Sequence, residues 1–250
     1  MERNDYKILL AEELAEANNK DAMLAVFNYF INHDDKALLV DNIERVMRYL
    51  SALAESGNSY AMRHLGNLYN DGRGVEQDHK KAIEWFEKSA AAGDTYAMCS
   101  LGYISYYGRG AELDYAKAYG YISRAAFLEN VNAMYKLGDM YYYGKHVKED
   151  KNAAFFWYDQ ADVCTSHSYE RASVDFRLGK CYLYGHGVEQ NIPKAIDCLA
   201  CAEESLMEQI EDGDPYGVAE HILPQVKKER DKVRSIVKIT ICEDEQEDCL

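Results

Sequence analysis

Cys198 and Cys201 form a CxxC pair, the spacing in this sequence that most resembles a redox or metal-binding motif. A structural zinc site needs four ligands, and one CxxC supplies two of them. A thioredoxin-type pair is expected at a helix N-terminus after a strand, whereas this pair falls inside a predicted helix. We therefore expect both cysteines to be packing residues, with a metal- or thiol-dependent enzyme as the less favoured alternative.

The remaining reactive residue types show no catalytic spacing. The histidines do not form HExxH, although His146 and His186 occupy the same place in two copies of one turn. The sequence contains no GxSxG and no glycine-rich loop of the Walker or dinucleotide type. We predict that the chain is not an enzyme and that it has no catalytic residues, no metal site and no cofactor.

An internal repeat organises the chain and must position any functional residues. Similar segments begin at Ala61, Ala97 and Ala133, spaced 36 residues apart, and a fourth begins at Val174. The later start of the fourth copy places an insertion near residues 163–172, which we expect to be a longer loop or a helix extension. Periods of this length are typical of solenoids.

Each repeat reads as two helices joined by a glycine turn. In the first copy Ala61, Leu65 and Leu68 follow helical spacing, and Gly72 and Gly74 suit the left-handed backbone that ends a helix. Asp78 is a predicted N-cap for the second helix. A glycine recurs inside the first helix, where it costs about 1 kcal/mol relative to alanine, so we predict close approach of the paired helix. The glycines and the alanines expected to face them are Gly66, Gly102, Gly138, Gly179 and Ala82, Ala118, Ala154, Ala195.

The Leu-Gly, Gly-x-Gly-Val, Lys-Ala and Trp-Phe/Tyr pattern over residues 42–203 resembles the Sel-1-like repeat (SLR) family, which is related to the tetratricopeptide repeats. Three positions depart from it: Ala111 replaces the turn valine, His146 replaces the second turn glycine, and Cys198 stands where Trp85 does. The resemblance implies an all-α fold, which is a right-handed α/α superhelical solenoid of helix-turn-helix repeats. It also implies an adaptor or scaffold role in protein complexes.

The repeats divide one solenoid domain into segments. We predict an N-terminal cap and degenerate first repeat at 1–60, and C-terminal capping helices at 205–240 followed by an acidic tail at 241–250. The repeats between them are expected at 61–96, 97–132, 133–173 with the insertion, and 174–204.

Composition limits the classes of partner and the cellular compartments that we expect for this chain. The chain carries 28 Lys and Arg against 43 Asp and Glu, a net charge of −15, which disfavours nucleic acid. No apolar run reaches the ~18 residues of a membrane helix, so we expect no membrane partner. The seven cysteines are irregularly spaced, which favours a reducing, cytoplasmic location.

The resemblance also implies that the first helices line a concave binding face. We expect this face to bind a peptide or helix of another protein that is basic or weakly charged. Its predicted residues are Tyr60, Arg63, Asn67, Asn70, Tyr96, Tyr103, Tyr106, Tyr135, Asp139, Tyr142, Phe176 and Lys180. Other tyrosines are assigned to packing: Tyr69, Tyr141 and Tyr182 to the core, Tyr107 and Tyr143 to contacts between repeats. A secreted or host-directed effector using the same surface is the alternative function.

Overall fold

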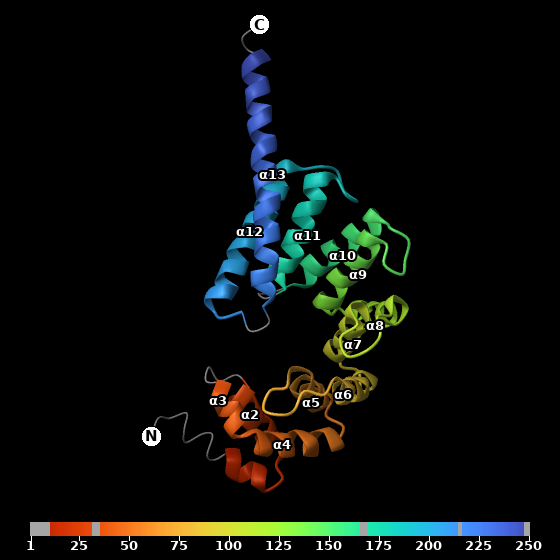
Figure 1. Ribbon diagram of the computed structural model, residues 1–250, viewed down its shortest axis with the longest axis vertical. Coiled ribbons are helices and arrows are strands. Elements are labelled where there is room, and N and C mark those ends of the chain that lie inside the picture. Colours follow the sequence, from red (N-terminus) through yellow and green to blue (C-terminus); the bar gives the residue numbers. More distant parts are fainter. Residues whose placement is uncertain (1–10, 32–35, 166–169, 215–216, 248–250) are drawn as a thin grey trace. The chain divides into compact units, whose positions relative to one another are not determined.

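A computed structural model of the chain describes residues 11–31, 36–165, 170–214 and 217–247, without the side chains of 36–37 and 238–247. These segments consist of helices and short connections, and no β-strand occurs in them (Figure 1). After a helical stretch at 11–16, the helices are α2 (Lys20–Ile31), α3 (Lys36–Asp41), α4 (Ile43–Glu55), α5 (Ser59–Asp71), α6 (His79–Ala91), α7 (Thr95–Tyr107), α8 (Tyr115–Phe127), α9 (Val131–Tyr143), α10 (Lys151–Cys164), α11 (Arg171–Tyr184), α12 (Ile192–Glu211) and α13 (Val218–Glu247). None of the described helices has both the length and the apolar composition needed to cross a membrane.

The chain divides into two compact units, Met1–Arg124 and Ala125–Leu250. Within the first unit α2 and α3 pack on α4, and α4, α5, α6 and α7 each pack on the next helix. Within the second unit the same sequential packing joins α9, α10, α11, α12 and α13. Packing between chain neighbours is typical of repeat arrays, in which each repeat contacts only the adjacent ones.

Capping residues set the helix boundaries in register with the repeat. Three first helices begin at an Asn or Asp whose side chain accepts a hydrogen bond from the backbone N–H three residues later, and these caps are Asn58, Asp94 and Asn130. Side-chain caps also begin four second helices, at Asp78, Asp114, Asp150 and Asn191. The first helices end at glycines with φ of 64 to 68°, namely Gly72, Gly108, Gly144 and Gly185. Glycine adopts this left-handed conformation without a steric penalty, so the turn geometry follows directly from the sequence.

The glycine inside each first helix makes room for a large side chain, which confirms the predicted close approach but changes the partner. A Cβ at Gly138 would lie 2.4 Å from the ring of Tyr158, and one at Gly66 would lie 2.6 Å from the ring of Phe86. Ile122 and Leu199 fill the corresponding space at the other two glycines. The predicted alanines are fully buried one helical turn earlier, so the glycine accommodates the bulky residue that follows each of them.

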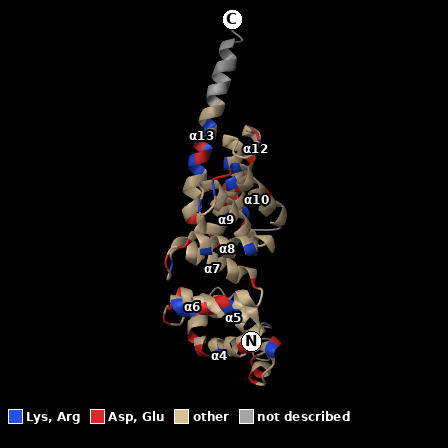
Figure 2. Ribbon diagram, turned by 90° about the vertical axis from the view of Figure 1, so that its right-hand side faces the viewer, with Lys and Arg blue, Asp and Glu red and all other residues tan. Residues whose placement is uncertain are grey.

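The two ends of the chain complete the packing within their own units. In the first unit Phe27 of α2 and Leu50 of α4 belong to the same core as Leu65 of α5. In the second unit Val226 and Val233 of α13 pack into the core that contains α12. Along α13 Lys and Arg alternate with Asp and Glu (Figure 2).

The acidic C-terminal segment continues α13 as far as Glu247 instead of forming a separate tail from residue 241. Glutamate and glutamine have high helix propensity, which agrees with this continuation. Residues 215–216, within the predicted capping helices, and residues 248–250 of the acidic segment lie outside the described residues. The insertion is described in part: α10 ends at Cys164 and α11 begins at Arg171, with residues 166–169 not described.

Candidate functional site

Arg63 connects the first helices of two successive repeats in the first unit. Its guanidinium carbon lies 5.0 Å from the ring centroid of Tyr60 on α5 and 5.3 Å from that of Tyr96 on α7. Arg63 Nε donates a hydrogen bond of 3.0 Å to Asp94, the carboxylate that also caps α7. Three of the predicted face residues are therefore in contact, and the Tyr96 side chain is 53% exposed.

Tyr60 is fixed by the N-terminal helices of its unit. Its hydroxyl donates a hydrogen bond of 2.9 Å to Asn28 Oδ1 on α2, and its ring lies 4.3 Å from that of His64. The His64 ring is also 4.8 Å from Phe27. Burial, helped by the nearby positive charges of Arg63 and Arg73, lowers the pKa of His64 to about 3. This histidine is therefore neutral at physiological pH.

The tyrosines at the end of α7 form an aromatic surface. The rings of Tyr103 and Tyr107 are stacked with centroids 6.0 Å apart, and Tyr106 lies 4.9 Å from Tyr107. Tyr106 also meets Tyr115 of α8 edge to face at 5.1 Å. Tyr107 is 48% exposed, whereas Tyr103 and Tyr106 are half-buried.

The two predicted asparagines on α5 have different surroundings. Asn67 is half-buried on the helix. Asn70 holds the turn that follows, because its carbonyl oxygen accepts a hydrogen bond of 2.8 Å from Gln77 and its Oδ1 lies 3.3 Å from His79 Nδ1. Asn70 therefore contributes to the turn, and its place on the binding face stays a prediction.

In the second unit Asp139 is buried in an ion pair. Arg177 of α11 donates to both of its carboxylate oxygens at 2.7 Å, and the Tyr158 hydroxyl donates to Oδ1 at 2.9 Å. Burial opposes ionisation, but the Arg177 guanidinium holds the pKa of Asp139 below its usual value. Arg177 also covers the Tyr135 ring, with its guanidinium carbon 4.5 Å from the ring centroid. Asp139 was predicted to face a partner, and its 7% exposure removes it from the accessible surface.

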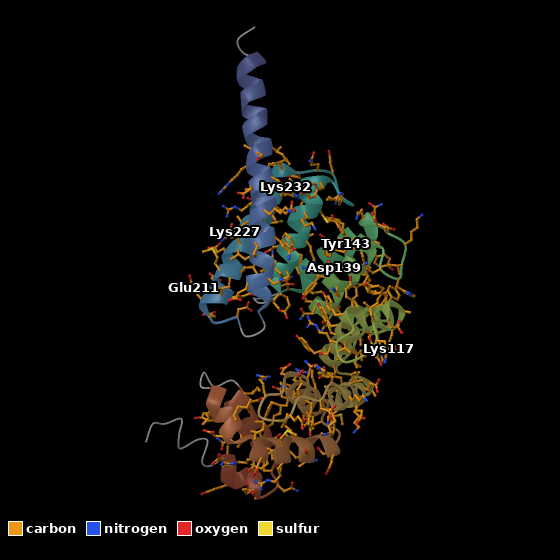
Figure 3. All side chains as sticks on the ribbon, in the orientation of Figure 1. Lys117, Asp139, Tyr143, Glu211, Lys227 and Lys232 are labelled. Atoms are coloured by element: carbon orange, nitrogen blue, oxygen red, sulfur yellow. The ribbon has the colours of Figure 1, made fainter. Side chains whose placement is uncertain are left out.

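Lys180 of α11 lies among aromatic rings from two first helices. Its Nζ is 5.0, 5.5 and 5.8 Å from the ring centroids of Tyr142, Phe176 and Tyr143, respectively. It also donates a hydrogen bond of 3.3 Å to the Tyr143 hydroxyl. We call these four residues the Lys180 cluster; Figure 3 labels Tyr143 on α9.

Tyr142 forms the buried floor of the Lys180 cluster. Its side chain and that of Phe176 are each 8% exposed, whereas Tyr141, predicted to be in the core, is half-buried. Tyr69 and Tyr182, predicted to be in the core with Tyr141, are likewise half-buried. Burial raises the pKa of Tyr142, whose hydroxyl lies 2.7 Å from His186 Nδ1. The face assignments of Tyr142 and Phe176 are therefore corrected, because both rings are buried, and so is the core assignment of Tyr141, whose ring is half-buried.

Three exposed tyrosines belong to the candidate surface although the sequence assignment left them out. Each is the last residue of a first helix, and each contacts a neighbour on that surface: Tyr107 stacks on Tyr103, Tyr143 binds Lys180, and Tyr184 stacks on His186 at 5.4 Å. Their shared position in three repeats was the signal that could have identified them. The contact of Tyr143 with α11 does join two repeats, as predicted.

The cysteine pair lacks the environment of a reactive thiol. Burial, followed by the negative charges of neighbouring carboxylates, raises the pKa of Cys198 to about 11 and also raises the pKa of Cys201. In the described part of the chain, no group of three or more His, Cys, Asp or Glu side chains is arranged to hold a metal ion. Cys198 is half-buried and Cys201 is exposed, so the predicted packing role is compatible with Cys198 and is wrong for Cys201.

Two cavities coincide with departures from the repeat pattern. One of about 460 Å³, in the first unit, is lined by Ala111 together with Leu101, Ile104 and Leu113. The other, of about 170 Å³ in the second unit, is lined by Cys198 and several charged side chains. Both Ala111 and Cys198 are smaller than the valine and tryptophan found at these positions in other copies.

Comparison with known proteins gives one family and a consistent fold. The Sel1 repeat family profile matches residues 59–94, 95–126, 131–161 and 173–205. The structure is similar to that of a Sel1 repeat protein from Oxalobacter formigenes, with 27% identity and a TM-score of 0.65 over 88% of this chain. It is similar, with 26% identity and a TM-score of 0.66 over 89% of this chain, to a protective antigen displaying an SLR fold in uropathogenic Escherichia coli strains.

These alignments cover 59% and 44% of the two solved proteins, so this chain matches only part of each. A third solved structure, described as a putative Sel1 repeat protein from Klebsiella pneumoniae, shares 18% identity with a TM-score of 0.50 over 87% of this chain and 98% of its own, and shows the fold alone. Comparison with curated proteins gives no match. The predicted fold class, an all-α solenoid of helix-turn-helix repeats, is confirmed by these findings.

Proposed function

Because the chain belongs to the Sel1 repeat family, whose members are generally protein-interaction scaffolds, we propose that it is an adaptor that binds another protein. The proposed binding segment of the partner is a peptide or a helix, and the proposed surface is the face presented by the first helices of the repeats. The net charge of this chain is −15, which favours a partner that is basic or weakly charged overall.

One observation supports this proposal: in each unit, aromatic and cationic side chains of one first helix contact those of the next first helix. In the first unit Arg63 connects Tyr60 of α5 with Tyr96 of α7. In the second unit Lys180 of α11 contacts Tyr142 and Tyr143 of α9. Each unit therefore offers an aromatic and cationic surface that extends over more than one repeat. Solenoid proteins bind partners on extended surfaces of this kind.

The chemistry of these side chains suits protein recognition. Tyrosine offers a large contact area with few rotatable bonds and a hydroxyl for hydrogen bonding, and aromatic residues with arginine dominate binding hot spots. The accessible members support the proposal best, and these are Tyr96, Tyr103, Tyr106 and Tyr107 in the first unit and Tyr143, Lys180 and Tyr184 in the second.

We further propose that this role is non-catalytic and cytoplasmic. The raised pKa of Cys198 keeps its thiol protonated, which disfavours thiol chemistry. All five described cysteines are free, which supports a reducing compartment.

The test uses two tyrosines of the proposed face, the exposed Tyr96 and the half-buried Tyr103, and a control tyrosine outside it. Wild type, a Tyr96→Ser/Tyr103→Ser double variant and a Tyr121→Ser variant are immobilised and used to purify partners from an extract for mass spectrometry. Tyr121 is half-buried on α8, a second helix, and therefore lies outside the proposed face. We expect the same proteins on wild type and Tyr121→Ser and their loss from the double variant, with far-UV helicity unchanged. Equal recovery by all three proteins would contradict the proposed face.

A further inference from the structure

Lys180 is a half-buried cation whose described surroundings contain no carboxylate partner. Within the described residues its polar contact is the Tyr143 hydroxyl at 3.3 Å, and its other neighbours are the rings of Tyr142, Tyr143 and Phe176. Cation–π contacts stabilise the ammonium group but leave its remaining N–H bonds available. The Lys180 ammonium can therefore donate hydrogen bonds to an anionic group that binds at the Lys180 cluster.

The other lysines around Tyr142 and Tyr184 are already neutralised. Lys151 lies 3.6 Å from the Tyr142 ring centroid and pairs with Glu149 at 3.2 Å. Lys232 donates to the Tyr184 hydroxyl at 2.8 Å and pairs with Glu229 at 3.0 Å. Of these three lysines, Lys180 is the one without a carboxylate at ion-pair distance among the described residues.

We propose that Lys180 binds an Asp or Glu side chain of the partner segment, an inference that rests on the proposed peptide-binding function. The ammonium donates to the carboxylate, while Tyr143 accepts one N–H of Lys180 and keeps its own hydroxyl hydrogen free to donate to the same carboxylate. Tyr143 is 53% exposed, so its hydroxyl can reach a bound segment. The partner can still be basic overall, because the site selects a single acidic residue.

A single carboxylate also fits the charge of the chain better than a polyanion does. Nucleic-acid binding requires several Lys and Arg side chains to neutralise successive phosphates. Here one unpaired lysine lies in a cluster flanked by Glu149 and Glu229, within a chain of net charge −15. The site therefore suits the single carboxylate of an acidic peptide residue better than it suits a polyanion.

The experiment measures selection of one acidic residue by the full-length chain. Three libraries of N-acetylated, C-amidated decapeptides carry Glu, Gln or Lys at a fixed central position and the same mixture of residues, without cysteine, elsewhere. The blocked ends exclude recognition of a terminal carboxylate. Retention is measured on wild type, Lys180→Gln, Tyr143→Phe and the control Lys227→Gln, whose lysine is exposed on α13 (Figure 3).

We expect wild type and Lys227→Gln to retain the Glu library about threefold more than the Gln library, as for one partly exposed ion pair. The Lys library is expected to be retained least. Lys180→Gln should abolish the preference for Glu, and Tyr143→Phe should reduce it. Melting curves check that the variants remain folded.

The alternative outcomes separate the two proposals. Equal retention of the Glu and Gln libraries on wild type would overturn the acidic-residue inference while leaving peptide binding intact. A Glu preference that persists in Lys180→Gln would overturn the assignment to Lys180. Failure of wild type to retain any library would contradict both this inference and the proposed function.

Discussion

Arg177 and Asp139 form a two-point ion pair that fastens α11 to α9 in the second unit, with both N–H···O distances at 2.7 Å. Tyr158 of α10 joins the same carboxylate, and its ring fills the space left by Gly138. One carboxylate therefore connects three consecutive helices. A residue predicted to bind a partner is instead part of the packing that positions the proposed binding surface.

Removing Arg177 is expected to destabilise the second unit strongly. Arg177→Met should lower the free energy of unfolding by about 3 to 5 kcal/mol, because it removes the two-point partner of the buried Asp139 carboxylate and leaves only the Lys136 ammonium, at 4.0 Å. Adding Asp139→Leu and Lys136→Met to this variant should recover part of the loss, since none of these three charges then remains buried. Urea unfolding followed by circular dichroism measures both effects. A loss below about 1 kcal/mol in the single variant would contradict the importance of this pair.

Two glycines in helices should respond oppositely to alanine. A Cβ at Gly138 would lie 2.4 Å from the Tyr158 ring, whereas one at Gly120 of α8 would meet no atom within 4 Å. We expect Gly120→Ala to stabilise by about 0.5 to 1 kcal/mol through helix propensity. Gly138→Ala should destabilise by about 1 to 3 kcal/mol because the ring must move. Denaturant unfolding of both variants tests this contrast, and equal stabilisation would show that the helices can separate at no cost.

The repeat frame and the turns were predictable because local sterics determine them. Gly72 and Gly74 have the predicted positive φ, and Asp78 caps the second helix as expected. These features depend on residues close in sequence, and the 36-residue spacing repeats them. The sequence alone was therefore sufficient to predict the helix pairs and the turns that join them.

The side-chain environments were less predictable because they depend on the neighbouring repeat. Asp139 and Arg177 are 38 residues apart, and no other copy has this pair at the equivalent positions. Tyr141 and Tyr142 differ by about 100° around the helix axis, so a small rotation of α9 decides which ring is buried. Only packing against the next helix fixes that rotation.

His146 occupies a turn position that favours glycine. Its φ is 69°, close to the 73 to 76° of Gly74, Gly110 and Gly187 at the same place in other copies. His146→Gly should therefore raise the free energy of unfolding by about 0.5 to 1 kcal/mol by removing the strain of a side chain in this conformation.

Gly187→Ala provides the opposite control for this turn. Its φ is 76°, and its Cβ would lie 2.1 Å from the Lys151 carbonyl oxygen, so the variant should be destabilised. Thermal and urea unfolding measure both changes. A loss of stability in His146→Gly would mean that the contacts of the imidazole outweigh the backbone strain.

His64 should make the first unit sensitive to mild acid. Burial and the charges of Arg63 and Arg73 lower its pKa to about 3, whereas an unfolded histidine titrates near 6.5. Between these values the unfolded chain binds more protons than the folded chain, so stability falls as the pH decreases through this window. For this one group the expected loss between about pH 8 and pH 5 is about 2 kcal/mol.

Comparing wild type with His64→Gln isolates this contribution. Both proteins share the other titrating groups, so the difference between their free energies of unfolding reports the histidine alone. We expect wild type to lose about 2 kcal/mol more than His64→Gln between about pH 8 and pH 5 in urea unfolding at matched ionic strength. Parallel stability curves for the two proteins would mean that the imidazole accepts a proton in the folded state, which the contacts with Phe27 and Tyr60 oppose by excluding water from the ring.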